Sequence, residues 1–322
     1  MTANAILGAL MGTAVGDALG MPIEGFSHQN VRTFYKGIKE MRADERRHDL
    51  EAGQWTDDTQ FTFALARVLT QHPEDPADWP AAAAAQYVAL RDEARRWGPT
   101  TTAAIDRLAD GAAPGDAGDP DGATDGAAMR AAPLGVWWAV RAARRADAWA
   151  ALRPVLAVTH RHPAALVAGW GQAAAVYRLA AFDDPRAPTI DSFWRPLIED
   201  VVWAEQQLNG DARVSQRLRR LTDVLNDVPL ELRDVCDGAG VAADEAWPFA
   251  VGMVVRRPHL LENTLLSGIN VGGDADTTGA MMGALLGVLH GWAAFPQEWK
   301  EALEATGALE EQARAFADAV RA

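Results

Sequence analysis

The chain has 322 residues, of which 49% are apolar and 23% are charged. This composition is that of a globular protein and excludes a disordered, collagen-like or disulfide-stapled chain. The 30 basic and 44 acidic residues give a net charge of −14, which argues against nonspecific nucleic-acid binding. Any anionic ligand must therefore be captured by local donors or by bound cations.

The single cysteine, Cys236, excludes an intramolecular disulfide and a multi-cysteine zinc site, and this usage fits a reducing compartment. We interpret Cys236 as a small buried thiol. The apolar stretch from Ile6 to Ile23 contains Asp17 and four glycines, and no positively charged region precedes it. It predicts neither a secretion signal nor a membrane span, so we expect a cytoplasmic protein that does not contact membranes.

Apolar residues recur at spacings of three and four along most of the chain, while alternating β-branched runs are nearly absent, which predicts an all-α protein. In chain order the expected helices are 5–19, 58–71, 79–96, 101–109, 126–146, 149–158, 163–182, 190–207, 211–225, 243–255, 258–267, 276–292 and 297–319. Candidate N-cap residues are Thr56, Asp191 and Asp276.

Glycines stand at every fourth position in the first and in the penultimate expected helix. They are Gly8, Gly12, Gly16 and Gly20 near the start, and Gly279, Gly283, Gly287 and Gly291 near the end. Each glycine in a helix costs roughly 1 kcal/mol relative to alanine, so the pattern implies close backbone approach by a neighbouring helix. We expect both helices to be buried and to pack together at the centre.

The stretch 110–125 is rich in Asp, Gly, Pro and Ala and predicts a loop. Its aspartates lack the spacing and the closing glutamate of a twelve-residue calcium loop. Because similar helices flank this loop and the glycine-rich helices are expected to pack together, we predict one domain over 1–322.

Two short clusters combine carboxylates and hydroxyls directly before or at the start of an expected helix. The first is Trp55-Thr56-Asp57-Asp58-Thr59, and the second is Gly272-Gly273-Asp274-Ala275-Asp276-Thr277-Thr278. Alone, either cluster could serve only to cap its helix and complement the helix dipole. If the two clusters face each other, four carboxylates would repel strongly unless cations neutralise them. The donors are all hard oxygens, which favours two Mg²⁺ or Mn²⁺ ions over zinc or copper.

Four segments in order resemble the ADP-ribosylglycohydrolase family, which includes the dinitrogenase reductase-activating glycohydrolase. They are the two clusters above together with Gly16-Asp17-Ala18-Leu19-Gly20-Met21-Pro22-Ile23-Glu24 and Asp125-Gly126-Ala127-Ala128-Met129-Arg130. The resemblance implies a compact all-α single domain of orthogonally packed helices with a binuclear magnesium or manganese centre. It also implies removal of ADP-ribose from modified side chains by cleavage of an N- or O-glycosidic bond.

Carried over by position, the resemblance makes Thr56, Asp57, Asp58, Asp274, Asp276 and Thr277 the metal ligands. Glu24, Asp58 and Asp274 become the candidate catalytic residues, and Glu24 falls on a family glutamate of a mobile loop. The substrate-binding candidates are Asp125, Gly126, Ala127, Ala128, Met129, His160 and Gly273.

The sequence departs from the family pattern at two positions. Asp125 stands where many members have Asn, which leaves a charge near the expected diphosphate. Ala275 stands where Thr is common, and it removes only a hydroxyl outside the ligand set. Because all six ligand positions are intact, we expect the metal centre to be retained.

Histidines and tryptophans provide the other candidates. His160 and His162 are two residues apart and do not share a helix face, so a zinc site is disfavoured, but the resemblance places His160 near the ligand. His48-Asp49 lies in a polar stretch and is interpreted as a solvated loop. Trp97, Trp137, Trp138 and Trp170 could stack on adenine, although core packing is the default for each.

Taken together, the sequence predicts a metal-dependent hydrolase that removes ADP-ribose from a protein side chain, with arginine linkage favoured over serine. A monomer is expected. Two alternatives remain open, namely a catalytically silent ADP-ribose-binding or crystallin-like structural protein, and a binuclear phosphoester hydrolase.

Overall fold

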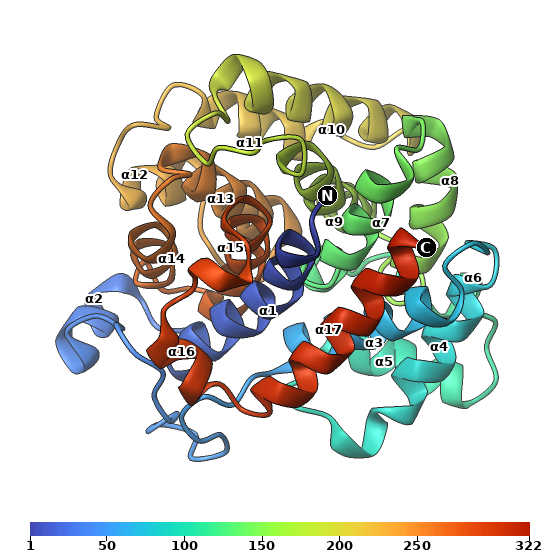
Figure 1. The fold of residues 1–322 in the computed structure, drawn as a ribbon, viewed down its shortest axis with the longest axis horizontal. Coiled ribbons are helices and arrows are strands. Elements are labelled where there is room, and N and C mark those ends of the chain that lie inside the picture. The colour runs from blue at the N-terminus through green and yellow to red at the C-terminus, as the bar shows by residue number, and fades with distance from the viewer.

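The computed structural model describes residues 1–322 and consists of helices, with three isolated β-bridges and no sheet. The first nine α-helices are α1 (Ala3–Gly20), α2 (His28–Asn30), α3 (Asp57–Gln71), α4 (Trp79–Ala89), α5 (Pro99–Ala109), α6 (Pro114–Ala117), α7 (Ala132–Arg141), α8 (Arg145–Leu156) and α9 (Pro163–Leu179). The others are α10 (Arg195–Gln207), α11 (Arg213–Leu221), α12 (Pro229–Val235), α13 (Ala243–Arg256), α14 (Leu261–Ile269), α15 (Ala275–His290), α16 (Gln297–Ala302) and α17 (Thr306–Arg321). The predicted all-α class is confirmed (Figure 1).

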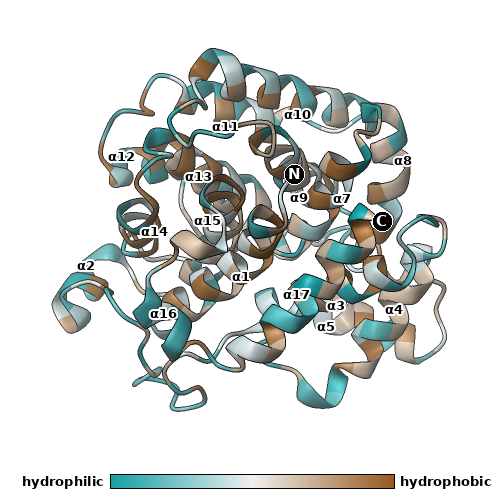
Figure 2. Cartoon of the chain, viewed as in Figure 1, coloured by the Kyte–Doolittle hydropathy of each residue, from teal (hydrophilic) through white to brown (hydrophobic).

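The helices share one hydrophobic core of 93 buried residues that runs from Ile6 to Val320 in sequence. Figure 2 shows apolar residues on the central helices and polar residues on the outer helices and loops. Cys236 is a free, buried thiol, as expected, and burial raises its pKa to about 12.

Several predicted helix boundaries are wrong for local reasons. The helix expected at 126–146 begins only at Ala132, because residues 125–131 form tight turns before the proline in the first turn of α7. The helix expected at 297–319 is divided into α16 and α17 at Ala305, whose φ is +55°. The seven-residue α12 was not expected, since it is too short to show helical periodicity.

Of the three expected N-cap residues, one occupies that position. Thr56 precedes α3, but Asp276 lies inside the first turn of α15, where Asp274 is the N-cap. Asp191 lies inside a turn that Thr189 caps through a reciprocal hydrogen-bond pair with Ser192. The hydroxyl pair satisfies the free backbone donors there, which leaves no capping role for Asp191.

The predicted pairing of the two glycine-rich helices is confirmed. α1 and α15 lie side by side and antiparallel at the centre of the molecule (Figure 1). Glycine meets glycine at three levels: Gly8 with Gly287, Gly12 with Gly283, and Gly16 with Gly279. A Cβ atom on Gly12 would lie 2.2 Å from the carbonyl oxygen of Gly283, so the backbones touch. Gly291 is the exception to the stripe, because it follows the end of α15 with a φ of +74°.

By length and composition alone, the segment Ala3–Ile23 could cross a membrane, with a mean hydropathy of 1.5. In the structure, the 18-residue stretch with this hydropathy is 100% buried inside the molecule. α1 is therefore the core helix that the glycine pattern predicts. Its antiparallel pairing brings the C-terminal half of α1 to the N-terminus of α15, and α3 packs against α1 at the same end.

Candidate active site

The N-terminus of α3 is fixed by a buried carboxylate from α1. Asp17 is fully buried and accepts hydrogen bonds from the backbone nitrogens and the hydroxyls of both Thr56 and Thr59, at 2.6–3.1 Å. The Thr56 hydroxyl also lies 3.1 Å from Oδ2 of Asp58. Burial raises the pKa of Asp17 to about 6, although these hydrogen bonds oppose the shift. Thr56 occupies the N-cap position, but the carboxylate of Asp17, and not the Thr56 side chain, accepts the hydrogen bonds from the backbone at the start of α3.

The N-terminus of α15 is shaped by two glycines with left-handed backbone, Gly272 and Gly273. A Cβ atom on Gly273 would lie 2.1 Å from the carbonyl oxygen of Ala239, so a side chain cannot be accommodated. The Gly273 nitrogen donates to the Phe26 carbonyl at 2.8 Å, and the Gly25 nitrogen donates back to the Gly273 carbonyl at 2.7 Å. These bonds hold the loop that carries Glu24 against the turn that precedes Asp274.

The two predicted clusters face each other across one cavity. Thr277 Oγ1 on α15 lies 3.3 Å from Oδ2 of Asp58 on α3, which joins the two helix starts directly. The cavity wall includes five carboxylate side chains: Glu24, Asp57, Asp125, Asp274 and Asp276. Thr277 and a group of neutral residues complete much of the lining, and Asp58 lies buried behind it.

Burial and mutual repulsion disfavour charge on these carboxylates. Burial raises the pKa of Asp58 well above its usual range, and the nearby charges of Asp17, Asp57, Asp276 and Asp274 raise it further. Burial likewise raises the pKa values of Asp57, Asp125, Asp274 and Asp276, and neighbouring carboxylates add to each shift. In the folded protein, bound protons or cations must therefore neutralise much of the negative charge of this cluster.

The donor chemistry of the cluster fits hard divalent cations. Three buried carboxylate oxygens have no hydrogen-bond partner, namely Oδ1 of Asp58, Oδ2 of Asp125 and Oδ1 of Asp276. The only other donors at the two helix starts are threonine hydroxyls, so the set consists of oxygen atoms, as Mg²⁺ and Mn²⁺ prefer. No group of three or more His, Cys, Asp or Glu side chains is already arranged around one point for a metal ion.

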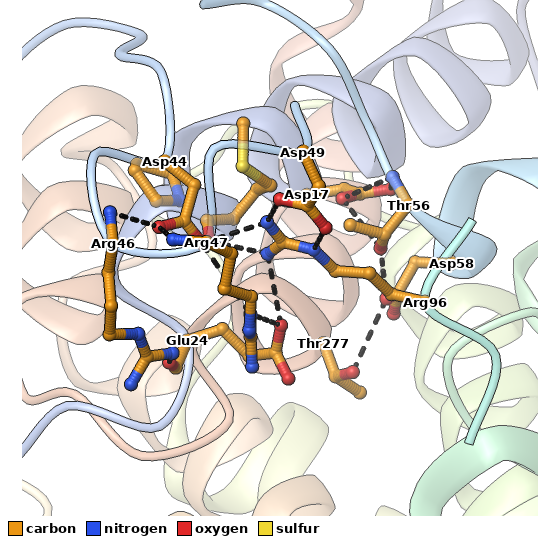
Figure 3. Close-up of polar contacts among 12 residues, drawn as sticks. Asp17, Glu24, Asp44, Arg46, Arg47, Asp49, Thr56, Asp58, Arg96 and Thr277 are labelled. Carbon is orange, nitrogen blue, oxygen red and sulfur yellow. Dashed lines mark hydrogen bonds and ion pairs between the residues drawn. The ribbon is translucent and has the colours of Figure 1, made fainter. Parts of the chain in front are cut away.

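One wall of the cavity is held by an arginine. Arg96 reaches the Glu24 carboxylate at 3.1 Å, Asp44 at 2.8 Å and Asp49 at 2.5 Å, and it also donates to the Met21 carbonyl (Figure 3). The hydrogen bond from Arg96 lowers the pKa of Asp49. Arg47 makes a second ion pair with Glu24, at 2.5 Å. Arg96 thereby joins three segments distant in sequence and fixes Glu24 at the rim.

Comparison with known proteins identifies the family of the chain. The model of the ADP-ribosylglycohydrolase family matches residues 2–322. The chain belongs to the ADP-ribosylglycohydrolase family. An uncharacterized protein of Archaeoglobus fulgidus is 31% identical over 94% of this chain and 93% of its own length. The ADP-ribosyl-[dinitrogen reductase] glycohydrolase of Rhodospirillum rubrum is 28% identical over 92% of this chain and 90% of its own.

A solved structure of an ADP-ribosylglycohydrolase-related protein complex has the same fold. Its TM-score is 0.74 at 26% identity, and the match covers 99% of this chain and 98% of that one. Family membership and these relatives indicate a glycohydrolase.

The structure brings most of the family-derived candidates to this ADP-ribosylglycohydrolase cavity and leaves others behind it. Asp125, Gly126 and Met129 line the same cavity as the two helix starts. The other four substrate-binding candidates do not line it: Ala127, Ala128, His160 and Gly273. Of the six metal-ligand candidates, Thr56 and Asp58 do not line it either. Ala127, Ala128 and His160 are fully buried, and Gly273 shapes the turn before Asp274 instead.

His160 lies in a second layer behind Gly126. A Cβ atom on Gly126 would lie 2.6 Å from Cε1 of His160, so the ring packs directly against this glycine. The exposed His48 and the ion-paired Asp49 belong to a surface loop, as expected. No tryptophan lines the cavity, and the four adenine-stacking candidates instead pack in or against the core.

Sequence reasoning missed Asp17, Arg96 and Thr124 as parts of this ADP-ribosylglycohydrolase site. The sequence did carry a signal for Asp17, because it is the only charged residue in the apolar helix α1 and a buried charge needs hydrogen-bonding partners. Arg96 and Thr124 carried no signal of their own. Their roles depend on loops that meet only in the folded chain.

Proposed function

We propose that this protein is a metal-dependent hydrolase that removes ADP-ribose from a modified side chain by cleaving its bond to C1″. The observation that carries the proposal is the meeting of two helix starts, on α3 and α15. Three of their four aspartates line one cavity, and the fourth, Asp58, is buried beside them. Family membership supports this class of bond, and the oxygen donors at the two helix starts support a site for two Mg²⁺ or Mn²⁺ ions.

The ions would be held by Thr56, Asp57, Asp58, Asp274, Asp276 and Thr277. Bound divalent cations would neutralise the carboxylates, bind ligand oxygens and lower the pKa of a water molecule. Asp17 would keep Thr56 and the first turn of α3 in place through its four donors.

In the proposed reaction the oxygen of water forms a bond with C1″ as the bond from C1″ to the side-chain heteroatom breaks. The water proton passes to a carboxylate, for which Glu24, Asp58 and Asp274 are the candidates, and a proton returns to the leaving group. The surrounding carboxylates stabilise the positive charge that develops on the sugar ring. Glu24 would act from the rim, where Arg47 and Arg96 orient it.

An arginine-linked substrate fits the charge of the cavity best. Five carboxylates line the wall, and its single basic side chain, Arg96, already pairs with acidic residues. Together with the buried Asp58 there are six carboxylates, and two divalent ions and Arg96 offset five of their six charges, so net negative charge remains. A guanidinium leaving group is cationic and would be attracted, whereas a serine hydroxyl is neutral.

The test is release of free ADP-ribose from arginine-linked and serine-linked ADP-ribosyl peptides, followed by chromatography with mass detection. The proposal predicts release from the arginine-linked peptide at the higher rate in the presence of Mg²⁺. A phosphate ester serves as the control substrate. Hydrolysis of that ester without release of ADP-ribose would favour a phosphoester hydrolase, and binding of ADP-ribose without release from any linkage would favour a silent binding protein.

A further inference from the structure

Behind the cavity lies a fully buried arginine without a carboxylate partner. Arg130 donates to the Gly126 carbonyl, to the Leu156 carbonyl and to the hydroxyl of Thr159. Its guanidinium carbon lies 5.3 Å from the ring centre of Tyr87, where a π-face offers weak compensation. A buried cation with only neutral partners is costly, so it points to a role in the arrangement of the neighbouring groups.

A continuous chain of hydrogen bonds connects Arg130 with the cavity wall. Arg130 contacts Thr159, and Thr159 Oγ1 lies 2.8 Å from Nδ1 of His160. Nε2 of His160 lies 2.9 Å from Oγ1 of Thr124, and Thr124 lines the cavity. The absence of a side chain at Gly126 lets the imidazole pass to Thr124.

The direction of this chain follows from the chemistry of its first member. A guanidinium can only donate, so Thr159 accepts from Arg130 and its own hydrogen is free for Nδ1 of His160. His160 is then protonated on Nε2 and donates to Thr124. The reverse direction would leave the buried Thr159 hydroxyl hydrogen without an acceptor, which is unfavourable. Burial lowers the pKa of His160 well below its usual range, consistent with a neutral ring.

Thr124 Oγ1 has no protein partner other than His160, so its hydrogen is available to a molecule in the cavity. We propose that the Thr124 hydroxyl is a directed donor to a phosphate oxygen of the bound ADP-ribosyl group, oriented by Arg130, Thr159 and His160. This inference rests on the proposed function and names a phosphate contact that compensates for the acidity of the cavity.

The surroundings explain why a phosphate needs such a donor. Arg96 is the only basic side chain that lines the cavity, and it is engaged by Glu24, Asp44 and Asp49. An anion in this cavity must therefore be bound by neutral donors or by bound cations, because no free basic side chain faces it. A hydroxyl whose oxygen accepts from His160 is polarised toward donation, because consecutive hydrogen bonds strengthen one another.

The direction of the chain can be measured without any ligand. Nitrogen-15 NMR of the histidine rings in the intact protein should show His160 as the neutral tautomer protonated on Nε2 at neutral pH. A ring protonated on Nδ1, or a doubly protonated ring, would overturn the inference.

The phosphate contact is tested by calorimetric titration of ADP-ribose, AMP and adenosine into wild type, Thr124→Val and Thr124→Ser. Valine keeps the shape and removes the donor, so affinity for ADP-ribose and AMP should fall about tenfold while affinity for adenosine is unchanged. Serine should restore the affinity. Thr102 on α5 is exposed and does not line the cavity, and Thr102→Val is the matched control, expected to bind all three ligands as wild type does.

Where turnover is measured, Thr124→Val should raise KM with little change in kcat. Unchanged ADP-ribose affinity, or an equal loss for adenosine, would overturn the phosphate contact while release of ADP-ribose by the wild type still supported the proposed function. Failure of the wild type to bind ADP-ribose at all would overturn both.

Discussion

Asp58 and Asp200 are both buried aspartates, but their surroundings give their charges opposite effects on stability. Asp58 faces other carboxylates, and its only hydrogen-bonding neighbours are the hydroxyls of Thr56 and Thr277, at 3.1 and 3.3 Å. Asp200 accepts from Arg178 at 2.5 Å and from Arg145 at 3.4 Å. In the proposed site the first residue binds a cation at the expense of stability, whereas the second stabilises the fold.

The contrast predicts opposite outcomes for one substitution. In chelator, Asp58→Asn should raise the free energy of unfolding, because it removes a charge that burial and repulsion disfavour. Asp200→Asn should lower the free energy of unfolding by about 1 to 3 kcal/mol, since it leaves the arginines without their acceptor. Urea unfolding followed by circular dichroism measures both. A loss of stability in chelated Asp58→Asn would contradict the electrostatic account of the site.

The increase in the free energy of unfolding that Asp58→Asn brings in chelator should also depend on pH. The folded pKa of Asp58 lies above its unfolded value, so the stability linked to its protonated form is present below about pH 4 and is lost as pH rises toward the folded pKa. In chelator, the free energy of unfolding of the wild type should thus equal that of Asp58→Asn in acid. Toward neutral pH it should be lower than that of the variant.

Residue types and spacing were sufficient to predict the two carboxylate clusters, because each cluster is continuous in sequence. The family resemblance, and not the spacing, placed His160 near the ligand, and the structure buries its ring fully behind Gly126. Arg96 could not be predicted from the sequence. Its function depends on three loops that meet in space, and no local pattern specifies such a meeting.

The pairing of α1 with α15 is the element on which the geometry of the site depends. Three glycine pairs let the two backbones touch, which sets the position of Asp17 relative to the N-terminus of α15. The periodic glycines predicted this contact from the sequence. The helix ends were less predictable, because the break at Ala305 and the turns at 125–131 depend on single backbone conformations.

Gly12→Ala tests this pairing directly. Its new Cβ atom would overlap the Gly283 carbonyl, so the helices must separate and stability should fall by about 3 kcal/mol or more. Gly307 in α17 is the matched control, because it is exposed and no neighbouring atom lies within 4 Å of the place that a Cβ atom would take. Gly307→Ala should gain about 0.5 to 1 kcal/mol from helix propensity. Equal effects at the two positions in thermal or urea unfolding would argue against backbone contact.

At the scale of the whole molecule, the net charge of −14 opposes the approach of an anionic ligand. Affinity for ADP-ribose must therefore come from short-range donors and bound cations, and not from long-range attraction. This differs from a basic phosphate site, in which added salt weakens binding.

Raising NaCl from about 20 mM to about 300 mM at saturating Mg²⁺ should leave the Kd for ADP-ribose unchanged or lower it, because screening reduces repulsion. Adenosine, which carries no charge, is the control and should show no salt dependence. Binding of ADP-ribose that weakens steeply with salt would show that a positive field captures the ligand.

The central claim is that the two helix starts form one cation-dependent hydrolytic site. The most direct measurement is the rate of ADP-ribose release from an arginine-linked peptide in Mg²⁺, after addition of chelator, and again after excess Mg²⁺. The account predicts release that stops and then resumes, and no release by a folded Asp274→Asn variant under any of the three conditions. Release that persists in chelator, or full activity in that variant, would contradict it.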